Sequence, residues 1–143
     1  MFILKNEIEF DSAHYLEGHH GKCANIHGHR YKLIVKIKGA KLKETGSRRG
    51  MIEDFSYIKQ ILKEVQGTFD HKLIIEDNIK GRALVDAIKS TGENFEFVLV
   101  PYRPTAEEMS RHIFNIIKDK GLDIHEVELY ETPGNSCIYS EDI

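Results

Sequence analysis

The stretch that decides the fold spans residues 27–38 and reads His27-Gly28-His29-Arg30-Tyr31-Lys32-Leu33-Ile34-Val35-Lys36-Ile37-Lys38. From Tyr31 onward, large apolar side chains recur at every second position, and lysines stand at several positions between them. A period of two predicts a strand with one buried and one exposed face, as in an antiparallel sheet. His27 and His29 share the parity of Tyr31, so we expect both imidazoles to project from one face at the start of this strand.

The first fourteen residues show the same alternation. One parity is shared by Phe2, Leu4, Ile8, Phe10, Ser12 and His14. This predicts a neighbouring strand, joined to the first by a loop rich in glycine, histidine and lysine at residues 17–23. If the two strands pair, His14 lies close to the two histidines that open the second strand.

Two amphipathic helices are predicted farther along the chain. Asp54 is a candidate N-cap, apolar residues at helical spacing follow it, and Gly67 supplies a stop. Thr105 and Glu108 form a capping-box pattern ahead of the second helix, which we expect to end at Gly121.

Further strands are expected at residues 95–100, 127–130 and 137–139, with a short helix around residues 82–90. The order is strand, strand, helix, a variable segment, helix, strand, strand, without a linker that separates domains. We therefore predict a single α+β domain over residues 1–143, with helices on one face of an antiparallel sheet.

Composition narrows the function classes. The chain has 143 residues, 41% of them hydrophobic, and a net charge of −3 from 20 basic and 23 acidic side chains. A mildly acidic protein lacks the positive charge that a dedicated nucleic-acid binder uses against phosphates. No apolar run approaches the roughly 18 residues that span a bilayer, and no signal peptide is recognisable. We expect a cytoplasmic protein with a small-molecule partner, and neither a nucleic acid nor a membrane as partner.

Histidines dominate the candidate chemistry. His14, His27 and His29 supply three imidazoles, and three neutral imidazoles with an open fourth position describe a catalytic Zn²⁺ site. Cys23, four residues before His27, has two open interpretations. It is either a fourth ligand, which makes the zinc structural, or a thiolate beside the metal that acts as base or nucleophile. Cys137 lies in an apolar run and is expected to be a buried small hydrophobe.

Two further groups are candidates on weaker patterns. Asp70 precedes His71, and a carboxylate beside an imidazole orients it for acid/base work. Glu131 stands near the end of a predicted strand, where a carboxylate can accept hydrogen bonds from a ligand's N–H groups.

Five motifs in this order resemble the 6-pyruvoyl-tetrahydropterin synthase / 6-carboxy-tetrahydropterin synthase family. They are Phe10-Asp11-Ser12-Ala13-His14, Cys23-x-x-x-His27-Gly28-His29, Asp70-His71, Pro104-Thr105-Ala106-Glu107 and Glu131-Thr132 with Cys137-Ile138-Tyr139. The resemblance implies the tunnelling fold: a four-stranded antiparallel sheet with two helices on one face. It also implies a homo-oligomeric β-barrel, commonly a hexamer of two trimers, with active sites between subunits.

The resemblance also implies roles for individual residues. His14, His27 and His29 would hold zinc, Cys23 would be the catalytic thiolate, and Asp70 and His71 would be its acid/base partners. Substrate binding would fall to Glu131 and Thr105, with Glu131 anchoring the pterin ring. The segment between Asp70-His71 and Pro104-Thr105 is longer than in compact bacterial members, which predicts an insert at roughly residues 76–100.

The implied reaction converts 7,8-dihydroneopterin triphosphate to 6-carboxy-5,6,7,8-tetrahydropterin, acetaldehyde and triphosphate, for the deazapurine of queuosine-type tRNA nucleosides. The close alternative is the pyruvoyl-forming synthase, which eliminates triphosphate and keeps the side chain. Two rivals come from other classes. A cupin-like oxygenase would want a glutamate where Leu33 or Ile34 stands, and a non-catalytic pterin-binding module would use Cys23 to close a structural zinc site.

Overall fold

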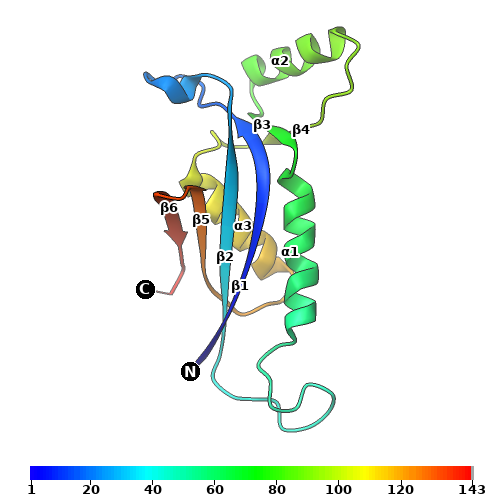
Figure 1. The fold of residues 1–143 in the computed structure, drawn as a ribbon, viewed down its shortest axis with the longest axis vertical. Helices are drawn as coiled ribbons and strands as arrows, with labels where there is room; N and C mark the ends of the chain where they lie inside the picture. Colours follow the sequence, from blue (N-terminus) through cyan, green and yellow to red (C-terminus); the bar gives the residue numbers. More distant parts are fainter. Residues whose placement is uncertain (143) are drawn as a thin grey trace.

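A computed structural model describes residues 1–142 of the chain. Strands β1 (Phe2–His14) and β2 (His27–Gly39) form a long antiparallel pair at its centre, visible in Figure 1. The loop between them contains one turn of 3-10 helix, η1 (Lys22–Ala24). The register pairs His14 with His27 and Ser12 with His29. The alternation predicted from the sequence is confirmed, because Phe10, Ser12 and His14 are buried along β1.

Four more strands complete a mixed sheet in the order β4-β3-β1-β2-β5-β6. β5 (Ile124–Thr132) and β6 (Asn135–Tyr139) extend the antiparallel part beyond β2. β3 (Lys72–Glu76) and β4 (Phe97–Val100) add parallel pairings beside the end of β1. The α+β class is therefore confirmed. The strand predicted at residues 95–100 and the short helix predicted around residues 82–90 correspond to β4 and to α2 (Ile79–Ser90), whereas β3 was not predicted. The four-stranded antiparallel sheet with two helices that the family resemblance implies is extended here by two parallel strands and one helix.

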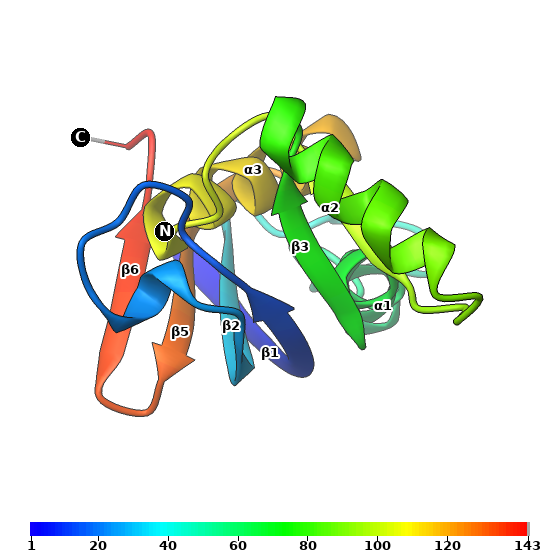
Figure 2. The same cartoon turned by 90° about the horizontal axis from the view of Figure 1, so that it is seen from above.

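Helices α1 (Phe55–Phe69) and α3 (Ala106–Asp119) cover one face of the sheet and enclose the main core (Figure 2). Asp54 caps α1 by accepting from the Ser56 N–H at 2.8 Å. The expected stop at Gly67 is wrong, since α1 continues to Phe69, whose side chain is fully buried. Burying a phenylalanine yields about 1.5–3 kcal/mol, which exceeds the cost of about 1 kcal/mol for a glycine in a helix.

Helix α2 (Ile79–Ser90) packs on the opposite face. Ile74 and Ile75 are neighbours on β3 and therefore point to opposite faces of the sheet. Ile74 belongs to the main core, whereas Ile75 lies under Gly81 of α2. The segment expected as an insert thus forms a β3-α2-β4 unit, and Figure 1 shows α2 at the end of the molecule that is farther from the N-terminus. Among the described residues, no helix is long and apolar enough to cross a membrane.

Candidate metal centre and active site

Three histidines converge where β1 ends and β2 begins. The register places His14, His27 and His29 on the face covered by α1 and α3, as the parity argument predicts. Their candidate ligand nitrogens all lie within 4.8 Å of one another. The ring centroids are 4.6 Å apart for His14 and His27 and 4.9 Å apart for His27 and His29. This spacing suits three ligands of a single ion.

Hydrogen bonds orient two of the three rings. His14 Nδ1 donates to the Pro104 carbonyl at 2.8 Å, and His27 Nδ1 donates to the Asn25 carbonyl at 2.6 Å. A carbonyl can only accept, so each of these two rings carries a proton on Nδ1, and in the neutral form of the ring the lone pair is on Nε2. The Nε2 atoms of His14, His27 and His29 are buried and have no hydrogen-bond partner among the described residues. Ligating histidines are oriented in this way in metal proteins.

Burial keeps two of these rings neutral. Desolvation lowers the pKa of His14, and it also lowers the pKa of His29, because a buried imidazolium loses its hydration. The neutral imidazole is the form that binds metal. Three imidazoles with orphaned Nε2 atoms fit Zn²⁺ with an open fourth position, and the donor set alone does not select zinc over other divalent ions.

Glu131 of β5 borders the histidine cluster. Its Oε1 lies 3.5 Å from His29 Nε2 and its Oε2 lies 3.9 Å from His14 Nε2. The same carboxylate lines a cavity of about 360 Å³ together with Thr105, Glu107 and Arg103. Glu131 and Thr105, both predicted to bind substrate, therefore share one cavity next to the cluster.

The two cysteines lie outside the histidine cluster. Cys23 is half-buried in η1 and is not part of the group of converging ligand atoms. This geometry favours an open site over one closed by a fourth protein ligand. Cys137 was expected to be buried but is partly exposed, because β6 is an edge strand, and it lines the cavity that holds Glu131.

Asp70 and His71 form a hydrogen-bonded pair directly after α1. His71 Nδ1 lies 2.9 Å from Asp70 Oδ2, and the backbone of β1 holds both residues. The Asp11 N–H donates to Asp70 Oδ1 at 2.9 Å, while the His71 N–H donates to the Asp11 carbonyl at 2.6 Å. His71 adopts φ 57°, a left-handed conformation uncommon for a residue with a side chain. Such strain persists where surrounding contacts enforce it.

The pair is electrostatically polarised. The hydrogen bond from the Asp11 N–H, followed by that from His71, lowers the pKa of Asp70. The hydrogen bond to Asp70 raises the pKa of His71. The His71 side chain is 75% exposed, so it is free to meet a ligand or a neighbouring molecule.

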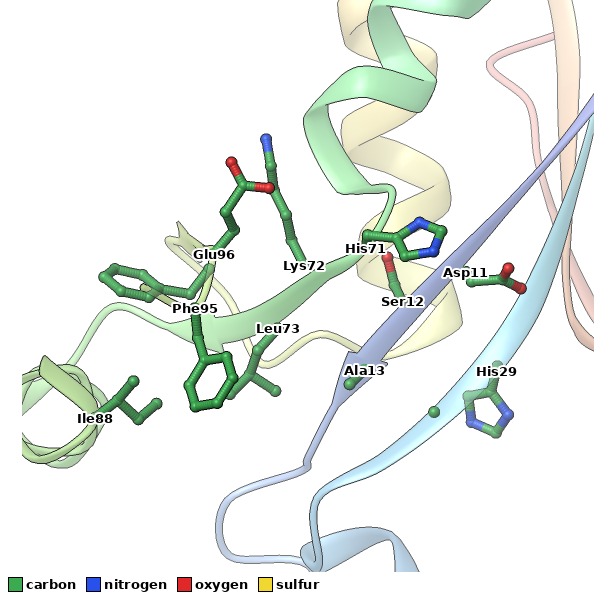
Figure 3. Close-up of a pocket in the computed structure, with 12 residues that line it drawn as sticks. Asp11, Ser12, Ala13, His29, His71, Lys72, Leu73, Ile88, Phe95 and Glu96 are labelled. Atoms are coloured by element: carbon green, nitrogen blue, oxygen red, sulfur yellow. The ribbon is translucent and has the colours of Figure 1, made fainter. Parts of the chain in front are cut away.

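A cavity of about 560 Å³ is bordered by His71 of this pair and by His29 of the histidine cluster (Figure 3). Leu73 and Phe95, visible in Figure 3, give it an apolar wall together with Phe97. Sequence reasoning missed this wall, because its phenylalanines belong to the segment expected as an insert. Arg30 is held by Asp11, because its guanidinium Nε and Nη2 donate to the Asp11 carboxylate at 3.0 and 3.2 Å.

Comparison with known proteins decides the family. The family model described as 6-pyruvoyl tetrahydropterin synthase matches residues 3–142. The chain belongs to this family. The matched residues include both the histidine cluster and the Asp70-His71 pair. The family implies a pterin substrate and an oligomeric assembly.

Three relatives of the chain share one name. A protein of Haemophilus influenzae named 6-carboxy-5,6,7,8-tetrahydropterin synthase is 41% identical over 143 residues, which cover 99% of this chain and 100% of the relative. Proteins of the same name from Rickettsia felis and Synechocystis are 34% and 31% identical, and each alignment covers more than nine-tenths of both chains. These relatives support a lyase that acts on a pterin.

Solved structures share the fold. An uncharacterized protein from Wolinella succinogenes superposes with a TM-score of 0.80 at 20% identity, covering 99% of this chain and 98% of that one. Caenorhabditis elegans 6-pyruvoyl tetrahydropterin synthase superposes with a TM-score of 0.69 at 22% identity, covering 99% and 96%. At these identities the likeness establishes the fold.

Proposed function

We propose that the chain is a zinc-dependent lyase that converts 7,8-dihydroneopterin triphosphate and one water molecule to 6-carboxy-5,6,7,8-tetrahydropterin, acetaldehyde and triphosphate. One observation carries the proposal: three buried Nε2 atoms converge beside Glu131 in a chain that is 41% identical to a protein named for this product. The product name of the relatives is what favours the carboxy-forming reaction over the pyruvoyl-forming one.

The residues divide the work by position. His14, His27 and His29 hold the zinc. When bound there, zinc polarises the oxygens of the substrate's hydroxylated side chain and makes neighbouring protons more acidic. Glu131 accepts hydrogen bonds from the N–H groups of the pterin ring, and Thr105 lines the same cavity.

Proton transfer uses two groups from different elements. Cys23, half-buried in η1, serves as the base that takes a proton from the substrate's side chain. His71 serves as the second acid/base group, with Asp70 holding its Nδ1 and favouring its charged form. The exposure of His71 agrees with an active site that a neighbouring subunit completes. A hexamer built from two trimers, a cytoplasmic location and the absence of a nucleic-acid partner stay predictions.

The deciding experiment incubates the purified protein with zinc and 7,8-dihydroneopterin triphosphate. Mass spectrometry identifies the pterin product, and a coupled dehydrogenase assay measures acetaldehyde. A carboxylated pterin with equimolar acetaldehyde supports the proposal. A pyruvoyl product without acetaldehyde identifies the alternative synthase, and unchanged substrate contradicts both.

A second experiment tests the non-catalytic alternative. Cys23→Ala retains zinc and loses turnover if Cys23 is the base, whereas it loses zinc if Cys23 closes a structural site. Cys137→Ala is the matched control for zinc content, since it removes the other thiol of the chain.

A further inference from the structure

The segment between β4 and α3 supplies the acceptor that orients His14. The Pro104 carbonyl accepts from His14 Nδ1 at 2.8 Å, and the Tyr31 hydroxyl lies 3.3 Å from the same nitrogen. Because this bond places the ring's proton on Nδ1, it decides that Nε2 faces His27 and His29 with a lone pair. Whatever fixes Pro104 therefore also fixes the direction of one ligand.

The backbone of this segment has few attachments of its own. Proline has no N–H, and the Thr105 N–H bonds within the segment, to the Arg103 carbonyl at 2.7 Å. One weak tie runs from Arg103 to the Glu17 carbonyl at 3.3 Å. The Thr105 carbonyl also accepts from the Met109 N–H of α3 at 3.0 Å, and Pro104 is buried. Beyond these restraints, side chains at the two ends of the segment hold the Pro104 carbonyl in position.

Both ends are attached to α3. On one side of Pro104, the Thr105 hydroxyl accepts from the Glu108 N–H and caps the helix. On the other side, the Tyr102 hydroxyl bonds His112 Nδ1, and the two rings meet edge to face at 5.4 Å. The His112 ring also packs on Phe69.

The protonation states define the direction of the Tyr102–His112 bond. Desolvation raises the pKa of Tyr102, and it lowers the pKa of His112. Tyr102 therefore keeps its proton and donates it, while neutral His112 accepts through Nδ1. The bond joins the start of the segment to the second turn of α3.

We propose that Tyr102 and His112 are positioning residues for the metal centre, whose hydrogen bond holds the Pro104 carbonyl against His14. Neither residue touches the ion, and each acts through the segment between them. The inference rests on the proposed function in one respect, namely that His14 is a zinc ligand.

The test compares Tyr102→Phe, His112→Phe and the double variant with the wild-type protein. Each substitution removes the hydrogen bond and keeps an aromatic ring in the packed site. Tyr57→Phe is the matched control, because it also removes a tyrosine hydroxyl that donates a hydrogen bond, here to the Lys120 carbonyl at 3.2 Å, and Tyr57 belongs to neither the histidine cluster nor its hydrogen-bonding shell. Zinc affinity is measured by competition with a chromophoric chelator, and the melting temperature of the metal-free protein is recorded in parallel.

We expect either single substitution to weaken zinc binding about tenfold, the lower end of the effect of groups that orient a metal ligand. The double variant is expected to be no weaker than the singles, because both remove the same bond. Tyr57→Phe is expected to bind zinc as the wild type does, although its melting temperature falls by a similar amount to that of Tyr102→Phe. A purely structural role for Tyr102 would lower the melting temperature and leave zinc affinity unchanged, and that result overturns the proposal.

A measurement without metal separates this inference from the proposed function. Long-range ¹H–¹⁵N spectra of the metal-free protein report the tautomer of His14, which we expect to carry its proton on Nδ1 in the wild type and to be mixed in Tyr102→Phe. An unchanged tautomer contradicts the inference. A wild-type protein that binds no zinc, yet shows the expected tautomer change, contradicts the metal centre and leaves the positioning role of Tyr102 supported.

Discussion

Substitution by alanine is expected to change stability in opposite directions at two helical glycines. Gly67 lies in α1 and Gly81 in α2. A Cβ at Gly67 would meet nothing within 4 Å, whereas a Cβ at Gly81 would lie 2.0 Å from the Glu76 carbonyl oxygen and 2.9 Å from Ile75. Alanine is favoured over glycine inside a helix by about 1 kcal/mol. Gly67→Ala is therefore expected to stabilise the protein by about 0.5–1 kcal/mol, somewhat less than the full value because Gly67 is near the end of its helix.

For Gly81→Ala the free-energy cost of the steric overlap exceeds the gain in helix propensity. Overpacking costs about 1–3 kcal/mol, and an overlap with a backbone oxygen belongs at the upper end of this range. After subtraction of the gain of about 1 kcal/mol, we expect a net loss of about 2 kcal/mol. The buried residues of α2 are Gly81 and Val85, so the strain is relieved by movement of α2 away from β3.

Urea unfolding followed by circular dichroism measures both free energies of unfolding. All variants are compared at one protein concentration and one zinc concentration, because ligands and subunit association shift apparent stability. The displaced α2 also opens the cavity that Ile88 lines together with His71, so Gly81→Ala is expected to lower turnover while Gly67→Ala leaves it unchanged. If Gly81→Ala stabilised the protein as much as Gly67→Ala, the packing of α2 on β3 described above would be refuted.

Three further predictions concern the site. Cys23→Ala is expected to lower turnover by about 10²–10⁴-fold with unchanged zinc content, as loss of an acid/base group does; zinc is counted by plasma emission spectroscopy, and loss of metal would contradict the role of base. His29→Ala is expected to lose zinc. In the wild type, zinc at a hundredfold excess over its Kd stabilises the protein by about 2.7 kcal/mol, and the variant is expected to lack this stabilisation. Thermal melts with and without metal check this, and an equal zinc-induced shift in the melting temperature of both proteins would exclude His29 as a ligand. Asp70→Asn is expected to lower the pKa of His71 toward its ordinary value, as followed by NMR titration. Because folding raises the pKa of His71, the protonated imidazole stabilises the protein below the ordinary pKa, and this stabilisation is lost as the pH rises through the folded pKa. This pH dependence of stability is expected to vanish in Asp70→Asn. An unchanged titration of His71 would mean that Asp70 does not hold the imidazole.

The histidine cluster was predictable because it depends on local alternation and one antiparallel pairing. The parity of β1 carries from Phe10 to His14, and that of β2 carries from Tyr31 back to His27. Once the two strands pair, the three imidazoles must share a face. The same reasoning places Asp70 and His71 after the first helix, where a capped amphipathic pattern ends.

The place of the two parallel strands in the sheet was not predictable in this way. The apolar run at residues 95–100 predicts β4, but the five residues of β3 are too few for periodicity to separate a strand from a buried turn of helix. The pairings of β3 with the end of β1 and of β4 with β3 are non-local, and only the assembled sheet shows that Phe97 stands beside Leu73 in register. The apolar wall next to His71 follows from that pairing, so no local pattern could reveal it.

The orientation of the proposed metal ligands shows a deeper limit of sequence reasoning. The ligands themselves are side chains that a pattern can identify, but their partners are the carbonyls of Asn25 and Pro104, which every residue type possesses. The paths of two loops set the positions of these carbonyls. One loop passes through η1, and the side chains of Tyr102 and Thr105 attach the other to α3. A change in the length of either loop is therefore expected to disturb the site more than a substitution of Asn25 does. The chemistry of the site comes from three imidazoles. Its geometry depends on backbone carbonyls, and the sequence determines their positions only through the packing of α3 against the sheet.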